Sequence, residues 1–384
     1  GDYEDYHGLF SIGLLDGRVQ FEGPIIKGKT SFNIGLRRSW IDIVTEPVSL
    51  IISKRQDRDF RIRYAFWDLN ANITHRFSEK SRLSFYLYGG RDAARFISGE
   101  GYEEYDNGTK VEMSYDNDAE MGLEWGNIVS QINWHYGISE GHDLSFKAYF
   151  SRYSALFSFE EEIKEGTLKD ILNSTYKYGA NRSRTSDVGL KADFSLRAGE
   201  RHHIRYGAGF QYHIYSPDYH TDRKASDGGN VIIDQHLKEN DRRQTFEPSA
   251  YIEDEITFTD RLTSNVGLRY SVILTGGRAY HSLQPRVALR FGLTDNTSLK
   301  MSYSEMTQND HQIASNYLQL PTNFWMPSTS KIAPSLSRQV SGGAYSNLPH
   351  NIRFSAEAYF KTMDNLLEFR GRWGIYPPIH LWEE

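Results

Sequence analysis

The sequence contains no cysteine, which fits a cell-envelope protein that avoids disulfide chemistry, although many cytosolic proteins also lack cysteine. It has no apolar run near the roughly eighteen residues that a membrane-spanning helix requires, so helical membrane spans are excluded. The net charge is −6 and no basic stripe is present, which argues against a nucleic-acid partner. Residues 1–5 have neither the positive charge nor the following apolar stretch of a signal peptide.

What the chain does contain is a long alternation of apolar and polar side chains. Between residues 204 and 214 every second side chain is apolar: Ile204, Tyr206, Ala208, Phe210, Tyr212 and Ile214. A two-residue period places these side chains on one face of a β-strand. Soluble strands usually run for about five or six residues, whereas a strand tilted across a bilayer needs about nine to eleven. The pattern recurs along the chain and therefore predicts a membrane-spanning β-barrel.

The mean hydropathy of −0.60 is compatible with this interpretation, because half of each barrel strand faces a polar lumen. The alternation predicts about fourteen strands, at residues 8–23, 30–41, 59–77, 82–96, 117–138, 143–159, 185–197, 203–216, 244–258, 262–276, 282–293, 297–306, 336–346 and 351–363.

The links between these strands alternate in length. Short polar links lie at 27–30, 78–81, 139–143, 199–202, 259–261, 294–297 and 349–351. Longer polar stretches lie near 42–58, 98–116, 161–182, 217–242 and 307–335, with a short exception at 277–281. Outer-membrane barrels have short periplasmic turns and long external loops, so we assign the short links to the periplasm and the long ones to the cell exterior.

Charges keep to one face of the predicted strands. In 188–196 the lysine and the aspartate alternate with the apolar side chains, as expected if a lysine or arginine at mid-bilayer costs about 2–4 kcal/mol. Asp254 is an exception, because it falls in phase with the apolar residues of its strand. The apolar phase also slips near Phe66 and Trp67, which a bulge or a strand top outside the bilayer would explain.

Aromatic residues lie near the proposed periplasmic ends and suggest an interfacial girdle, although aromatic residues favour strands in general. They are Phe32, Phe77, Trp134, Tyr136, Phe258 and Phe291.

Five segments, in order over residues 8–369, carry a family resemblance. They are residues 21–42, 250–270, 284–304, 320–337 and 357–369. Together they resemble the barrel of a TonB-dependent outer-membrane receptor of a Gram-negative bacterium. The resemblance implies a 22-stranded barrel closed by an N-terminal plug domain. It also implies that the TonB complex drives import of a large, scarce nutrient such as a siderophore–iron complex, haem, cobalamin, a glycan or a peptide.

Two departures from the family pattern lead us to expect a receptor fragment. The plug and TonB box would precede Gly1, and roughly eight final strands would follow. Residues 371–384 do not alternate and contain Pro377 and Pro378, which disfavour a strand interior. The expected fold is therefore all-β, a partial antiparallel transmembrane barrel of about 14 strands out of a probable 22, over residues 1–370, with an irregular tail at 371–384. Transport by the fragment alone is doubtful, because its strand edges would be unpaired.

The expected partners are outer-membrane lipid, the receptor's own plug domain, the TonB complex through N-terminal parts, and a surface lipoprotein. No catalytic constellation stands out, so we expect neither enzyme activity nor a cofactor. The acidic run 116–120 could bind calcium through oxygen ligands or could simply end a solvated loop. His202 and His203 could bind a metal, but no third ligand lies nearby in the sequence.

Aromatic and histidine side chains of the external loops are the candidate ligand contacts, because their rings offer apolar faces with polar tips to sugars, haem or aryl chelates. They are Tyr102, Tyr105, Tyr176, Tyr178, Tyr215, Tyr219, His220, Tyr280, Tyr317 and Trp325. They could instead stiffen the loops or pack against a surface lipoprotein. Arginines on the lumenal side are expected to meet acidic groups of the plug and lumenal water. They are Arg197, Arg205, Arg269, Arg286 and Arg290.

Two other functions compete with the transport receptor. A passive porin or structural outer-membrane barrel would share the strand pattern. A soluble β-rich enzyme or carbohydrate-binding module would carry charges on both faces of its strands, which the one-sided segments 188–196 and 204–214 contradict.

Overall fold

The computed structural model describes residues 1–56, 58–106, 110–167, 171–313, 324–349 and 352–367. The tail at 371–384 lies outside these residues. The described elements are β1 (His7–Ile12), β2 (Asp16–Ile26), β3 (Thr30–Ser39), α1 (Ile41–Gln56), β4 (Asp59–Ser78), β5 (Ser81–Asp106), β6 (Lys110–Ser139), β7 (His142–Gly166), β8 (Ile171–Ala198), β9 (His202–Tyr215), β10 (Asp218–Asp227), β11 (Asn230–Asn240), β12 (Arg243–Thr259), β13 (Leu262–Thr275), β14 (Arg278–Gly292), β15 (Thr297–Gln308), β16 (Asp310–Ile313), β17 (Phe324–Pro327), β18 (Ser335–Leu348) and β19 (Ile352–Asp364).

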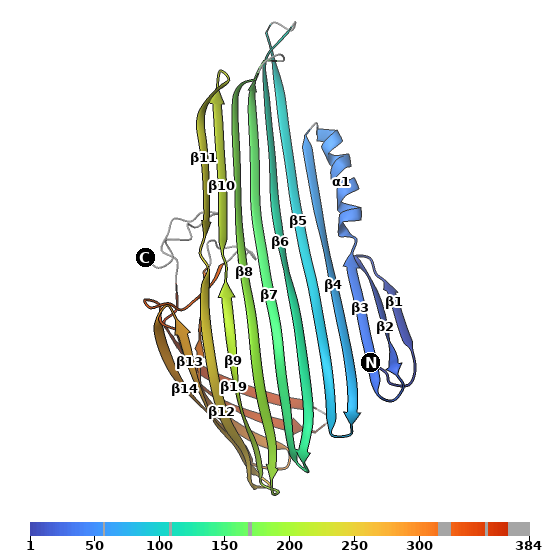
Figure 1. Ribbon diagram of the computed structural model, residues 1–384, viewed down its shortest axis with the longest axis vertical. Coiled ribbons are helices and arrows are strands. Elements are labelled where there is room, and N and C mark those ends of the chain that lie inside the picture. The colour runs from blue at the N-terminus through green and yellow to red at the C-terminus, as the bar shows by residue number, and fades with distance from the viewer. Residues whose placement is uncertain (57, 107–109, 168–170, 314–323, 350–351, 368–384) are drawn as a thin grey trace.

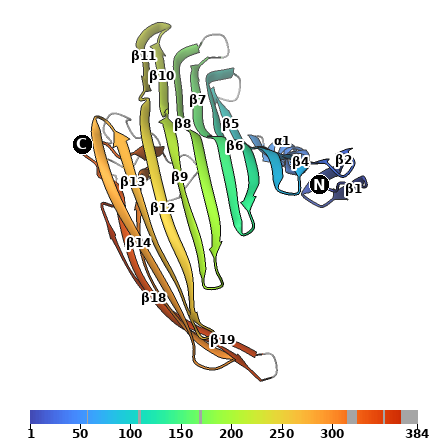
Figure 2. The ribbon, with the colours of Figure 1, turned by 60° about the horizontal axis from the view of Figure 1, so that its bottom comes forward.

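Seventeen of the described strands form one curled antiparallel sheet, in which each strand pairs mainly with its neighbours along the chain (Figures 1 and 2). β9 pairs with both β8 and β12, and β15 pairs with β18. Within the described residues no pairing joins β19 to β1, so the sheet is open there. The all-β, antiparallel barrel architecture expected from the alternation is confirmed.

The sheet has three strands more than the fourteen predicted. The segment expected as one strand at 8–23 divides into β1 and β2. The stretch 217–242, expected as a loop, forms the hairpin β10–β11 instead, and β10 pairs with the upper part of β8. Pro217 lacks a backbone N–H and separates β9 from β10. Gly228 and Gly229, with φ of +55° and +79°, make the tip, as a type I′ turn requires.

Other stretches that were predicted as loops also form regular secondary structure. The stretches 98–116 and 161–182 are mostly strand, because β5 to β8 run for 25 to 30 residues, far beyond what a bilayer needs. The stretch 42–58 forms α1 beside the upper part of β4 (Figure 1). The Ser53 hydroxyl there donates to the Phe60 carbonyl and accepts from its N–H, both at 2.7 Å. None of the helices in the described ranges is long and apolar enough to cross a membrane.

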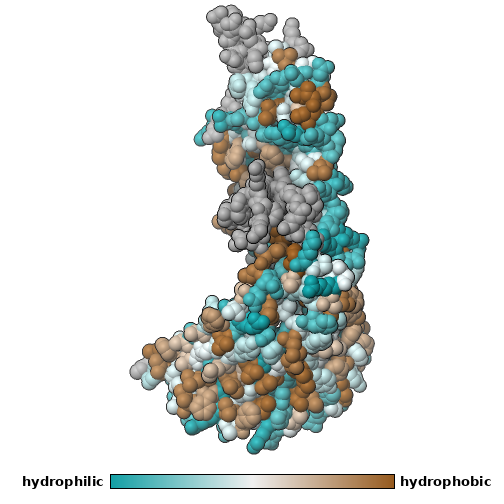
Figure 3. All heavy atoms as spheres, turned by 90° about the vertical axis from the view of Figure 1, so that its left-hand side faces the viewer, coloured by the Kyte–Doolittle hydropathy of each residue, from teal (hydrophilic) through white to brown (hydrophobic). Residues whose placement is uncertain are grey.

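The lower parts of the strands expose their apolar side chains on one face. Tyr206, Ile252 and Leu268 lie opposite one another on this outer face. Leu268 is 42% exposed and Leu283 58%, with no second layer over them. In Figure 3 apolar residues spread over the lower part of the molecule. An exposed apolar surface of this extent fits a wall in contact with hydrocarbon.

The apolar phase reverses along β4 without a bulge. Below Trp67 the outer face carries Leu69 and Ile73, whereas above it Ile62 and Phe66 lie on the inner face. The register is unbroken from residue 59 to residue 76, which excludes the bulge and leaves the strand top outside the bilayer as the explanation. β6 shows the same reversal.

The Asp254 exception lies near the short turn after β12. Its Oδ2 is 2.6 Å from Nδ1 of His202 on the same outer face. The six aromatic residues of the proposed girdle also lie on this outer face, near the short turns.

Candidate functional site: the inner wall and its mouth

In the lower part of the sheet, the inner face carries most of the charged side chains. Arg205 forms an ion pair with Glu253 (Nε–Oε1, 2.6 Å), and Arg269 lies 3.8 Å from Glu247. These two arginines already have an acidic partner within the wall, and their expected contact with acidic groups of a plug stays a prediction. Arg197, Arg286 and Arg290 have no ion pair with any described residue, and for them that expectation stays a prediction.

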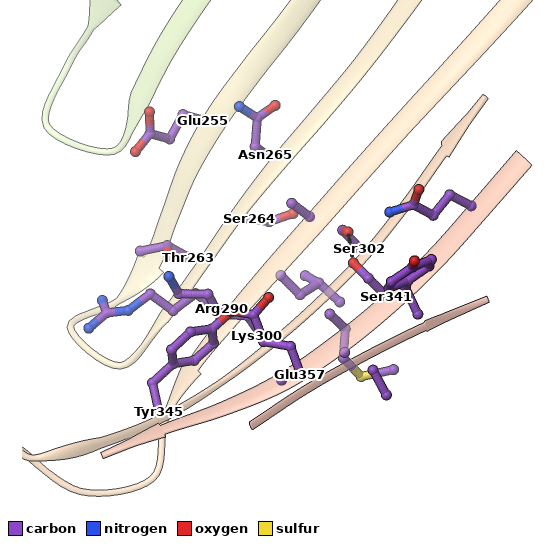
Figure 4. Close-up of a pocket in the computed structure, with 18 residues that line it drawn as sticks. Glu255, Thr263, Ser264, Asn265, Arg290, Lys300, Ser302, Ser341, Tyr345 and Glu357 are labelled. Atoms are coloured by element: carbon purple, nitrogen blue, oxygen red, sulfur yellow. Dashed lines mark hydrogen bonds between the residues drawn. The ribbon is translucent and has the colours of Figure 1, made fainter. Parts of the chain in front are cut away.

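A polar cavity of about 460 Å³ lies on the inner wall near the short turns, between β12 and β19 (Figure 4). Arg290 and Lys300 supply positive charge, while Glu255 and Glu357 supply negative charge. The Lys300 ammonium lies 4.4 Å from the Tyr345 ring centroid, and the Tyr345 hydroxyl donates to Glu357 at 2.7 Å. This cavity can accommodate a polar polypeptide segment or water. Its described lining residues do not include a nucleophile paired with a general base.

At the opposite end, residues 309–313 and 324–334 fold onto the inner wall, and β16 and β17 pair there as a small separate sheet. Buried polar contacts hold the segment. The Asn309 side chain donates to Thr245 Oγ1 at 3.1 Å, and its carbonyl accepts from the Ser328 N–H at 3.0 Å. Thr275 Oγ1 donates to the Ser328 carbonyl at 2.6 Å. Ser328 is 0% exposed and Thr245 1%, so these bonds are shielded from water. We call these four residues the mouth anchor.

Two further contacts strengthen the mouth anchor. Tyr215, fully buried at the top of β9, donates its hydroxyl to the Asp310 carboxylate. Ile313 and Met326 form a small apolar cluster against which Tyr219 packs. The described residues of the predicted external loop 307–335 therefore pack against the inner wall instead of projecting outward.

His311 lies inside the same segment. Its Nε2 is 3.1 Å from the Ser328 hydroxyl and its Nδ1 is 3.4 Å from the Ser335 hydroxyl. Burial lowers the pKa of His311, which favours the neutral imidazole, against a smaller opposing effect of Asp310.

Four of the ten predicted ligand contacts come together at this mouth. Tyr215 and Tyr219 make the contacts with Asp310 and with the Ile313–Met326 cluster described above. The Tyr280 hydroxyl donates to the Thr329 carbonyl at 2.6 Å, and Trp325 is half-buried on β17. Ligand contact by any of them stays a prediction.

The remaining six lie elsewhere. Tyr176, Tyr178 and His220 share the outer face above the bilayer, where Tyr178 and His220 meet edge to face at 5.6 Å. Tyr102 stacks on Tyr115 at the top of the sheet, with ring centroids 5.0 Å apart. Tyr105 belongs to β5 by its backbone. Tyr317 lies outside the described residues.

Neither proposed metal position assembles a ligand set. His202 and His203 point to opposite faces, toward Asp254 and Ser195 respectively. The acidic run 116–120 belongs to β6 rather than to a loop, and Glu120 lies 3.5 Å from Arg95. In the part of the chain that the structure describes, no three histidine, aspartate or glutamate side chains could hold a metal ion together.

Two short sequences match catalytic motifs in residue type and spacing. Residues 23–30 (Gly-Pro-Ile-Ile-Lys-Gly-Lys-Thr) have the spacing of a phosphate-binding loop, and residues 137–141 (Gly-Ile-Ser-Glu-Gly) that of a nucleophile elbow. Both motifs require a strand that leads into a helix. Here both lie at hairpins between antiparallel strands, β2–β3 and β6–β7, so neither forms such a site.

Sequence reasoning missed Asn309, Thr245, Thr275 and Ser328 of the mouth anchor. These are single small polar residues at strand ends or in a long polar stretch. In the sequence such a residue is expected to be exposed to solvent, and no local pattern shows that it is buried. The only sequence signal was the length of the stretch 307–335, since long loops without their own secondary structure are often functional.

The chain belongs to the TonB-dependent receptors: the family model described as "TonB dependent receptor-like, beta-barrel" matches residues 48–376. It is therefore an outer-membrane protein of a Gram-negative bacterium, in a family of transport receptors. The comparison with curated proteins gives no match.

Solved structures share the fold. The RagAB peptide importer in the "closed-closed" state aligns with a TM-score of 0.55 at 11% identity, covering 92% of this chain and 44% of that one. The siderophore receptor PiuA from Acinetobacter baumannii aligns at 0.53 and 11% identity, covering 92% and 56%. The ferripyoverdine receptor of Pseudomonas aeruginosa aligns at 0.52 and 10% identity, covering 93% and 48%. The chain spans about half the length of these structures.

Proposed function

We propose that this chain is the barrel portion, over residues 1–370, of a receptor that imports a large nutrient across the outer membrane. The external mouth binds the ligand, a plug domain moves within the lumen when the TonB complex pulls, and the ligand passes to the periplasm. No covalent chemistry is involved, and we propose no enzyme activity.

The observation that carries this proposal is the difference in polarity between the two faces of the sheet. An exposed apolar outer face surrounds a wide inner face rich in charged and hydrogen-bonding groups. A wall of this kind suits an aqueous lumen that holds a polar plug. Arg286 and Arg290, which form no ion pair with a described residue, and the polar cavity of Figure 4 are the positions we assign to plug contact.

The ligand class follows from the mouth. Tyr219 and Tyr280 place aromatic rings beside residues 309–313 and 324–334, and Trp325 belongs to β17 within them. We assign the ligand contact to these three side chains. Aromatic surfaces with hydrogen-bonding tips suit a siderophore–iron complex, haem, a glycan or a peptide. The similarity to a peptide importer and to siderophore receptors supports this range.

A surface lipoprotein is a further proposed partner. Tyr176, Tyr178 and His220 face outward above the bilayer, where they are better placed to meet a second protein than a ligand inside the lumen. A passive porin is the alternative function. The packing of residues 309–313 and 324–334 against the inner wall and the family match both favour the receptor.

Uptake by intact cells that carry the full-length receptor tests the proposal. Labelled candidate ligands should accumulate only when TonB is present, and deletion of 307–335 should abolish uptake. A matched deletion of the β10–β11 tip, residues 226–231, removes external chain without touching the mouth anchor and should leave most uptake. Uptake without TonB would indicate a porin, and uptake that survives the 307–335 deletion would contradict the assigned mouth.

A further inference from the structure

Four arginines gather on the outer face at the level where the outward apolar side chains end. They are Arg91, Arg152, Arg182 and Arg184. The register aligns them across the sheet: Arg91 lies opposite Gly126 of β6, and Gly126 lies opposite Ser154 of β7. Ser154 in turn lies opposite Arg184 of β8. Arg152 is two residues below this row and Arg182 two residues above it.

These residues line a groove of about 380 Å³. Gly126 and Ser154 form its floor, since their small side chains leave room between the arginines. Trp67, 44% exposed, stands at one side, and Ile128 lies on the bilayer side of the row. Tryptophan at this height is typical of a membrane–water interface.

Most of the positive charge in the groove is not neutralised by the wall. Arg91 pairs with Glu124 at 2.5 Å. Arg152 donates through Nε to the Ser186 hydroxyl at 3.2 Å and forms no ion pair with a described residue. Among the described residues neither Arg182 nor Arg184 forms an ion pair, although Asp218 lies across from Arg182 on β10. The Nε of Arg184 is buried without a hydrogen-bond partner, a state that an added acceptor would relieve.

An outward arginine on the other side of the sheet shows the contrast. Arg338 of β18 lies 2.8 Å from Asp364 and 3.8 Å from Glu305, both on the same face. There the protein supplies its own carboxylates. In the groove the described lining holds one carboxylate, that of Glu124, for four guanidinium groups, so the groove keeps a net positive charge.

We propose that this groove binds the phosphate group of a phosphorylated lipid in the outer leaflet of the outer membrane. Guanidinium groups bind phosphate through paired, charge-assisted hydrogen bonds. A lipid places its phosphate at the interface and its acyl chains against the apolar wall directly below, which carries Ile132 and Phe150. The groove opens on the outer face, away from the lumen, so an imported ligand does not reach it.

Binding of lipid A, a phosphorylated glycolipid, to the purified full-length receptor tests the proposal by native mass spectrometry. The variant R152Q/R182Q/R184Q should bind at least about tenfold more weakly, because it removes the charge-assisted contacts. The R338Q variant removes one outward arginine elsewhere and should bind like the wild type. Replacement of the three groove arginines by lysine should restore part of the binding, which a merely misfolded protein would not do.

Two controls separate the lipid from a free anion. Dephosphorylated lipid A should bind weakly to every variant. Inorganic phosphate at the same concentration should not displace the lipid. Equal binding by the wild type and the triple glutamine variant would overturn the proposal, and so would arginine-dependent binding of inorganic phosphate as tight as that of lipid A. The outcome is independent of which nutrient the receptor imports.

Discussion

The lower and upper halves of the long strands use the same alternation in opposite ways. In β6 the lower half directs Ile128, Ile132 and Trp134 outward, whereas the upper half directs Met121 and Trp125 inward. The strand itself is continuous between the two. The side that carries apolar residues is therefore set by the surroundings: hydrocarbon outside the lower half, and water outside the upper half.

The reversal shows that the upper half is built like the wall of a soluble protein. On its inner face Ala155 and Phe157 are buried, and its outer face carries charged pairs such as Arg95 with Glu120. The arginine groove lies at the boundary between the two regimes. The substitutions below test whether the two halves respond differently to the same chemical change.

The largest expected effect is that of an arginine placed on the outer face. Leu268→Arg, in the middle of β13, should lower the free energy of unfolding in lipid vesicles by about 2–4 kcal/mol, because the guanidinium then lies in hydrocarbon. Ile97→Arg is the matched change in the upper half, where the new side chain faces Glu120. It should change the free energy by no more than about 0.5 kcal/mol.

Denaturant unfolding of the full-length receptor in vesicles measures both variants. Equal losses at the two positions would show that the outer faces share one environment and would remove the basis for the membrane boundary at Trp67.

The next effect concerns the mouth anchor. Asn309→Ala removes the donor to Thr245 and leaves that buried hydroxyl without this partner, which should weaken the anchor by about 1–3 kcal/mol. Hydrogen exchange of the amides at 310–313 and 324–329 should become faster by the corresponding factor. Asn296→Ala, at an exposed short turn, is the control and should leave exchange at the mouth unchanged. Unchanged protection in Asn309→Ala would contradict the anchoring role.

The sequence contained most of the fold but little of the mouth. Side-chain alternation specifies each strand locally, so the lower strands such as β9 and β13 were predicted nearly to their ends. The tops of β5 to β8 were not predicted as strand. Apolar residues there move from the outer to the inner face, so the alternation expected of a lipid-facing strand ends at the membrane boundary although the strand continues. The hairpin β10–β11 was missed because polar residues predominate in it and its apolar residues, Val231, Ile232, Ile233 and Leu237 of β11, do not alternate regularly. Tyr215 was predicted as an external contact, and its burial depends on Asp310, 95 residues away.

A smaller effect is expected at the tip of the β10–β11 hairpin. Gly229 has a φ of +79°, so Gly229→Ala should cost about 1–2 kcal/mol of backbone strain. Gly199, with φ of +72°, lies at a short turn at the lower end of the sheet. Gly199→Ala therefore introduces the same strain where the membrane-spanning strands stabilise the turn. Limited proteolysis should cut Gly229→Ala at the hairpin while Gly199→Ala stays intact. Cleavage of both at equal rates would show that the projecting hairpin is no weaker locally than the lower turns.

The smallest effect is a pH response of opposite sign at two histidines. His311 has a lowered pKa because of burial, so its contribution is complete above the unfolded value of about 6.5 and declines as the pH falls below it. His236 has a raised pKa because of its hydrogen bond with Asp222, so its contribution is complete below about 6.5 and is lost as the pH rises through the folded value.

Acidification from about pH 7.5 to about pH 5.5 should therefore loosen the mouth while it tightens the hairpin. Hydrogen exchange, corrected for the intrinsic rate at each pH, should show less protection at 310–313 and more at 231–239. His311→Asn should abolish the first change alone, and His236→Gln the second alone. If both regions moved in the same direction with pH, a global change in the barrel would explain the response better than the environments of these two side chains.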